Sequence, residues 1–106
     1  MIKFMVVLYR KTDISAEEFR ANLRAIHGPL AERIPGLRKY VQNHVALDPS
    51  RMHPGWDAVV ELYWDDRESM EKAWRSPEGQ AATEHLKEFA DLSKTTWAIV
   101  EEDVRR

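Results

Sequence analysis

The chain has 106 residues, no cysteine, and 16 basic against 18 acidic side chains, which gives a formal net charge of −2. This length fits one domain, taken as residues 1–106, and the lack of cysteine excludes disulfides, thiolate metal sites and a cysteine nucleophile. The nearly balanced charge argues against nucleic-acid binding, which normally requires a basic surplus. Four tryptophans are unusual in so short a chain, and composition alone does not say whether they fill a core, line a pocket or contact a partner.

The start of the sequence carries no recognisable targeting signal. Its longest early apolar run, residues 4–9, is too short for a secretory core or a membrane span, and no small-residue cleavage site follows it. We therefore expect a cytoplasmic protein without a membrane partner.

The first predicted elements are a strand and a helix. Residues 2–9 are rich in β-branched and aromatic side chains and are apolar on both parities, which indicates a strand covered on both faces. A helix should begin after Ser15, because Ser15 and Glu18 have the spacing of a capping box. Ile14 and Phe19 have the spacing of a hydrophobic staple.

Helical spacing predicts the buried face of this first helix, formed by Phe19, Leu23, Ile26 and Leu30. Pro29 should disturb the helix, because proline removes the hydrogen bond to the carbonyl of Ala25. We therefore expect a helix that is not straight.

The middle of the chain is predicted to form two strands. Pro35-Gly36 is a turn, and strand character returns over residues 37–47. Residues 48–55 form a loop by composition, and the next strand covers residues 56–64.

The rest of the chain predicts helical structure and a last strand. Asp65 with Glu68 should cap a short helix that buries Met70, Ala73 and Trp74. Ser76-Pro77 should restart a helix whose inward face, with Ala82, Leu86 and Phe89, continues to about residue 92. The final strand covers residues 95–100.

The order of these elements is β-α-β-β-α-β, a ferredoxin-like α+β domain with a four-stranded antiparallel sheet and its helices on one face. Several strands carry apolar residues on both parities, so the sheet face without helices should expose a large apolar patch. This predicts a homodimer whose sheets pack face to face.

His27 is the first candidate for chemistry. It lies where Gly28 and Pro29 weaken the helix, and a neutral imidazole there could move a proton near neutral pH. The alternative is a histidine that caps carbonyls left without partners by the kink, and the sequence leaves both open.

Tyr40, Gln42 and His44 alternate along one face of the second strand. On a strand covered on both sides, they call for a wet cavity or satisfied hydrogen bonds. The alternative is an edge strand whose polar face meets solvent.

Asp57 and Glu61 share a parity on the third strand. Such carboxylates can hold a catalytic water or orient an imidazole. The alternative is that they pair with basic residues of a neighbouring strand, for example Arg38 or Lys39.

Neither a metal nor a cofactor motif stands out. His85 borders the inward face of the second helical region, where it could ligate haem iron or simply pack its ring. His27, His44 and Glu61 could form a two-histidine, one-carboxylate site, although no spacing rule supports that trio. We therefore expect no cofactor and no metal.

Several segments resemble the EthD-domain family and follow one another in the same order as in that family. They comprise residues 2–10, 27–30, 34–40, 41–44, 61–64, 76–79 and 91–96. The resemblance implies a dimeric α+β barrel. Relatives of that build include muconolactone methylisomerases and cofactor-independent polyketide dehydratases or cyclases. It also implies that His27 and Tyr40 are the acid–base groups.

The function that we expect is a small cofactor-independent enzyme of isomerase, lyase or dehydratase type acting on a hydrophobic aromatic or lactone metabolite. His27 would move the proton and Tyr40 would donate to a carbonyl oxygen. Gln42, His44, Glu61, Asp57 and Trp64 are the expected substrate-binding residues. The alternatives are an oxidoreductase, including a haem-dependent monooxygenase-like protein, and a dimeric accessory protein that binds a metabolite without turning it over.

The role expected of each tryptophan depends on the sheet face that it occupies. Trp74 should pack in the core beside Met70. Trp56 and Trp64 share one parity of the third strand, and Trp97 lies in the last strand. An indole on the same face as Tyr40 would contact substrate, whereas one on the other face would stabilise the dimer.

Overall fold

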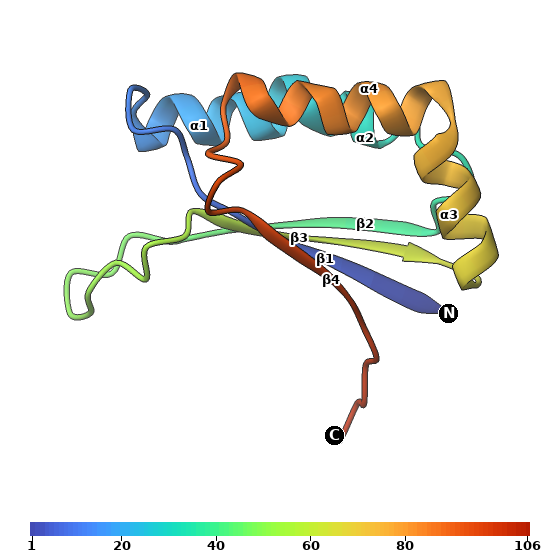
Figure 1. The fold of residues 1–106 in the computed structure, drawn as a ribbon. Coiled ribbons are helices and arrows are strands. Elements are labelled where there is room, and N and C mark those ends of the chain that lie inside the picture. Colours follow the sequence, from blue (N-terminus) through green and yellow to red (C-terminus); the bar gives the residue numbers. More distant parts are fainter.

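A computed structural model describes residues 1–106 and shows a four-stranded antiparallel sheet with all helices on one face (Figure 1). The strands are β1 (Ile2–Leu8), β2 (Lys39–His44), β3 (Ala58–Trp64) and β4 (Thr96–Val100), in the order β2-β3-β1-β4. This confirms the ferredoxin-like fold. Each strand is shorter than predicted, because the predicted ends lie beyond the paired ladders.

The first helical region has three parts: α1 (Ala16–Asn22), a π-helical turn η1 (Leu23–His27) and α2 (Gly28–Ala31). Ser15 caps α1 as predicted, and its Oγ accepts a hydrogen bond from the Glu18 amide at 3.0 Å. The π turn ends two residues before Pro29, and the Gly28 amide donates to the carbonyl of Leu23, five residues back. The predicted disturbance at Pro29 thus takes the form of one extra residue in a helical turn.

This extra residue changes which side chain faces inward. Ile26, predicted to be buried, is 53% exposed, and its place is taken by His27, which is buried with Leu23 and Ala31. An ideal α-helix would have kept the spacing that led to Ile26. The prediction for Ile26 was therefore wrong because the π turn shifts the helical frame by one residue.

The second helical region consists of α3 (Arg67–Arg75), α4 (Pro77–His85) and a 3₁₀ turn η2 (Leu86–Glu88). The cap of α3 is Asp66, whose side chain accepts from the Ser69 amide at 2.8 Å. The predicted cap, Asp65, instead forms a two-bond ion pair with Arg38, so that prediction was wrong by one residue.

The predicted cap at Ser76 is confirmed: its Oγ accepts from the Gly79 amide at 3.0 Å, and Pro77 is the first residue of α4. None of these helices has the length and apolar character needed to cross a bilayer.

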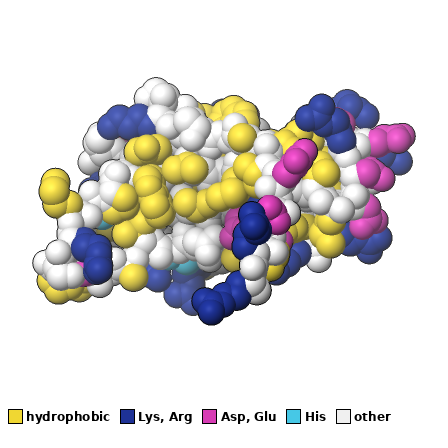
Figure 2. Space-filling view, turned by 90° about the horizontal axis from the view of Figure 1, so that it is seen from below, with side chains coloured by type: hydrophobic (Ala, Val, Ile, Leu, Met, Phe, Trp, Pro, Cys, Tyr) yellow, Lys and Arg dark blue, Asp and Glu magenta, His cyan; other side chains and the backbone are white.

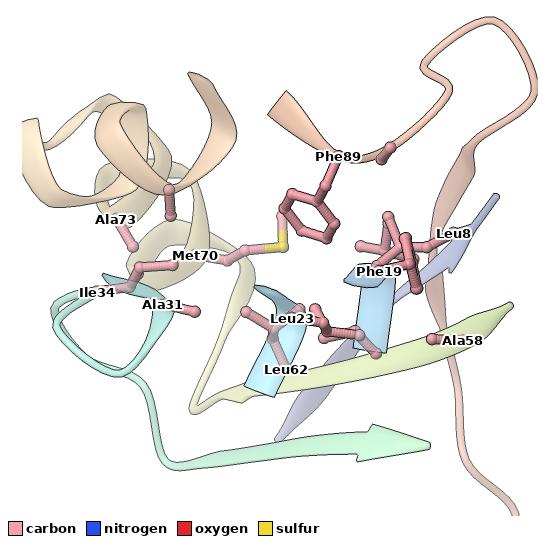
Figure 3. Close-up of a cluster of buried hydrophobic side chains, with 14 of the residues drawn as sticks. Leu8, Phe19, Leu23, Ala31, Ile34, Ala58, Leu62, Met70, Ala73 and Phe89 are labelled. Carbon is pink, nitrogen blue, oxygen red and sulfur yellow. The ribbon is translucent and has the colours of Figure 1, made fainter. Parts of the chain in front are cut away.

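The core lies between the helices and the upper face of the sheet (Figure 3). Phe19 and Phe89 pack with ring centroids 5.3 Å apart, and Leu62 and Met70 are buried near them. Trp64 is fully buried, and its Nε1 donates to the backbone oxygen of Pro35 at 3.1 Å. Trp64 is therefore a core residue, which corrects its prediction as a substrate contact.

The opposite face of the sheet has no helix over it. Figure 2 shows a band of hydrophobic side chains across this open face, with charged side chains gathered mainly toward one side. The strand register places on it the side chains of Met5, Val7, Val41, Val59 and Ala98. Both faces of the sheet are thus apolar in part, as the two-parity pattern predicted.

Gly79, in the first turn of α4, packs against the end of α3, where a methyl group would overlap the backbone oxygen of Ala73. We predict that Gly79→Ala lowers the free energy of unfolding by roughly 1–3 kcal/mol, since backbone on both sides would have to move. Urea unfolding followed by circular dichroism measures this loss. The control Glu78→Ala, on the exposed side of the same turn, should change little, and an unchanged Gly79→Ala midpoint would contradict the clash.

Candidate functional site

The helix-facing side of the sheet contains an apolar cavity of about 630 Å³, here called the helix–sheet cavity. Its apolar lining consists of Phe4, Val6, Met70, Trp74, Leu86, Trp97 and Ile99. Its polar lining consists of Glu71, Gln80, Thr83 and Glu84. A concave, mainly apolar site of this size with a few polar groups is typical of small-molecule binding.

The fold explains how these side chains meet. In the β1–β4 pairing, Phe4 lies opposite Ile99 and Val6 opposite Trp97, so all four point toward the helices. Helices α3 and α4 cover them from above (Figure 1). Because β4 is an edge strand, Trp97 remains 57% exposed.

A row of polar side chains lies on β2, at the other edge of the sheet. Gln42 Nε2 donates to the Tyr40 hydroxyl and to the Leu23 carbonyl, both at 2.9 Å, and Gln42 Oε1 lies 3.1 Å from His44 Nε2. Because Oε1 can only accept, His44 carries its proton on Nε2. The hydroxyl proton of Tyr40 remains available for donation. Here the two alternatives combine: β2 is an edge strand, yet its polar row is satisfied beneath the helices.

Burial keeps this row neutral near pH 7. It raises the pKa of Tyr40 above its usual value of 10.0 and lowers the pKa of His44 below 6.5. The guanidinium groups of Arg20 and Arg24 lower the pKa of His44 further. Tyr40 is therefore a hydrogen-bond donor and His44 an uncharged imidazole.

His27 forms a pair with His85 of α4. The Nδ1 atoms lie 3.2 Å apart, and the rings stack with centroids separated by 5.4 Å, beside Phe89. Burial, followed by the proximity of His85, lowers the pKa of His27 to about 4. His27 is thus a neutral imidazole, and its Nε2 has no hydrogen-bond partner.

The structure does not join His27 directly to Tyr40. Gly28 packs against Gln42, and a methyl group at Gly28 would lie 3.2 Å from Gln42 Nε2. The His27 ring instead points toward α4. The two acid–base candidates therefore lie in one helix–sheet layer without a bond between them, and neither lines the helix–sheet cavity.

Glu61 lies away from this layer, whereas Asp57 borders it and lines a surface cavity together with His44 and Phe19. Glu61 is on the open face, where it accepts from Lys3 at 2.6 Å and from Asn43 at 2.8 Å, and these contacts lower its pKa. Asp57 accepts from the Arg10 amide at 2.9 Å. Both carboxylates pair with basic residues, although with other partners than Arg38 and Lys39. Glu61 and Tyr40 occupy opposite faces of the sheet, so the structure does not bring Glu61 together with the other candidates on β2.

The position of Glu61 on the open face also bears on metal binding. Glu61 lies across the sheet from His44, so His27, His44 and Glu61 do not converge. No group of three or more His, Asp or Glu side chains is placed to hold a metal ion.

Sequence reasoning missed the carboxylates Glu71 and Glu84 that line the cavity, and it missed the pairing of His85 with His27. One signal for the pairing was available, because His85 follows Ala82 by three residues and precedes Phe89 by four. The tryptophans separate by depth: Trp64 and Trp97 share the face of Tyr40, but only Trp97 lines the cavity. Trp74 packs on Trp64 and also lines the cavity.

Comparison with known proteins gives one family match: the model of the EthD domain matches residues 11–93. An EthD family protein from Bacillus halodurans is 29% identical, with a TM-score of 0.81, and the match covers 97% of this chain and 100% of that one. A dimeric ferredoxin-like protein from Bacteroides fragilis is 18% identical, with a TM-score of 0.69 and 95% of each chain covered.

The cofactor-independent oxygenase SnoaB from Streptomyces nogalater has the same fold at 13% identity, with a TM-score of 0.65, and the match covers 99% of this chain and 93% of that one. The search of curated proteins found no match.

The His27–His85 pair should make stability depend on pH. Because the pKa of His27 falls from 6.5 to about 4 on folding, the unfolded chain binds more protons between these values. The contribution of His27 to the free energy of unfolding is therefore complete above pH 6.5. Roughly 3 kcal/mol of it is lost as the pH falls toward 4. Urea unfolding at a series of pH values should show a shallower loss for His27→Gln than for the wild type. The exposed control His53→Gln should keep the wild-type slope, and equal slopes in all three proteins would contradict the assignment.

Proposed function

Because the chain belongs to the EthD-domain family, we propose that it is a small enzyme that binds a hydrophobic aromatic metabolite and performs acid–base chemistry on it without a bound cofactor. The helix–sheet cavity supports the binding part of this proposal, whereas the acid–base part rests on His27 and Tyr40, which lie outside its lining. Its volume suits a small organic molecule, and the indoles of Trp74 and Trp97 offer flat surfaces for an aromatic ring.

In this proposal the acid–base groups are His27 and Tyr40. His27 takes or gives a proton through Nε2, the ring nitrogen without a partner. Tyr40 donates its hydroxyl proton to a carbonyl oxygen and stabilises negative charge there, because its oxygen already accepts from Gln42. Gln42 and His44 hold Tyr40 in that orientation.

Binding and chemistry are tested separately, since neither His27 nor Tyr40 lines the cavity. Native mass spectrometry of the purified protein identifies the retained ligand, which then serves as the substrate in turnover assays. We predict that Trp97→Ala loses most of the retained ligand, whereas Trp56→Ala, outside the cavity lining, keeps it. Ligand retention unaffected by Trp97→Ala would contradict binding in this cavity.

With the identified ligand, His27→Gln and Tyr40→Phe should each lower turnover by about 10²–10⁴-fold while binding persists. Equal turnover in the variants and the wild type would remove these residues from the mechanism. Binding without any turnover by the wild type would favour the accessory, non-catalytic function.

The second candidate is oxidation of the bound aromatic compound by molecular oxygen. It is favoured by the shared fold with a cofactor-independent oxygenase and by the apolar character of the cavity. An oxygen electrode separates the two functions, because acid–base isomerisation or dehydration consumes no oxygen.

We also propose that the protein works as a homodimer through its open sheet face. Dimeric neighbours share the fold, and the apolar band in Figure 2 has no other cover within the chain. Leu47 and Met52, in the loop that projects between β2 and β3, expose further apolar surface.

Sedimentation equilibrium should therefore show a dimer at micromolar concentration. Val59→Glu, at the centre of the open face, should weaken dimerisation by roughly 100-fold or more, since each protomer would bury an unpaired carboxylate in the interface. Ile26→Glu, on the exposed outer side of the helices, is the matched control and should stay dimeric. A wild-type monomer would refute the dimer.

A further inference from the structure

The charge of the helix–sheet cavity is one-sided. Its two ionisable lining residues are the carboxylates Glu71 on α3 and Glu84 on α4, and its lining contains no Lys, Arg or His. Glu84 pairs with Lys87, which lies outside the lining. Glu71 has no ion-pair partner within the chain.

Like the carboxylates, the indoles of the cavity favour a cationic ligand. The faces of aromatic rings attract cations, and tryptophan does so most strongly. Trp97 comes from the edge strand and Trp74 from α3, so aromatic surface is present on both the sheet side and the helix side of the cavity. Two indoles and two carboxylates around an apolar space form a suitable environment for an ammonium group attached to an aromatic body.

An anionic ligand would meet the opposite situation. A carboxylate in this cavity would approach Glu71, which has no ion-pair partner, and Glu84, whose pairing with Lys87 offsets part of its charge. Like charges at short range oppose binding, and solvent around these exposed carboxylates weakens the repulsion without removing it. The repulsion remains even when the aromatic part of the ligand fits.

We infer that the helix–sheet cavity selects a flat aromatic ligand that carries an amino group and rejects the equivalent ligand that carries a carboxylate. This inference rests on the proposed function and narrows its substrate class.

Isothermal titration calorimetry with three probes of one shape tests the selection: naphthylmethylamine, naphthalenemethanol and naphthoate. The amine should bind roughly tenfold more tightly than the alcohol, and naphthoate should bind most weakly. Because the carboxylates are partly solvent-exposed, the spread among the probes should shrink in high salt.

Matched variants assign the effect to the two carboxylates. Glu71→Gln and Glu84→Gln should each reduce the preference for the amine over naphthoate by about threefold, the size expected for an exposed ion pair. Glu68→Gln on α3 and Glu78→Gln on α4 remove the same charge from the same helices outside the cavity lining, and should leave the preference unchanged.

Three results would overturn the inference. If all three probes bind equally, the cavity binds aromatic compounds without charge selection, and the proposed function stands alone. If the control variants reduce the preference as much as Glu71→Gln and Glu84→Gln, the effect is one of overall charge. If no probe binds, the proposed binding site fails together with the inference.

Discussion

The carbonyl oxygen of Leu23 accepts two hydrogen bonds, and the helical side of the molecule depends on this arrangement. One comes from the Gly28 amide and closes the π turn; the other comes from Gln42 on β2. The first bond rotates His27 inward to meet His85. The second ties the helix to the polar row of β2 and leaves the Tyr40 hydroxyl free to donate. A single backbone atom thus sets the positions of both acid–base candidates.

Much of the fold was predictable because it follows from local patterns. The caps at Ser15 and Ser76, the disturbance at Pro29 and the two-faced strands are written in short stretches of sequence, and the structure has all of them. The inward position of His27 was not predictable, because a proline indicates that a helix will deviate but does not say in which form. The place of the cavity at the β4 edge was equally hidden, since α3, α4 and β4 meet only in the folded chain.

The candidate site divides into two parts with different physical character. The helix–sheet cavity, under α3 and α4, is apolar, open at the β4 edge and bordered by carboxylates. The region under α1 and α2 is polar and internally satisfied, with hydrogen bonds that fix tautomers and orientations. The first part has the shape to hold a ligand and the second has groups suited to proton transfer. This division explains why a list of polar candidates read from the strands did not locate the cavity.

The extra residue of the π turn also bears on how such a domain can change through evolution. Each residue added to or removed from a helix rotates the side chains beyond it by about 100°. A relative without this extra residue would turn a different side chain, at the position of Ile26, toward α4, while its sheet and core could stay as they are. One insertion is therefore enough to exchange a hydrocarbon for an imidazole in the interior. The fold can acquire or lose reactive groups through changes in helical phase, with no new loop and no rebuilt scaffold.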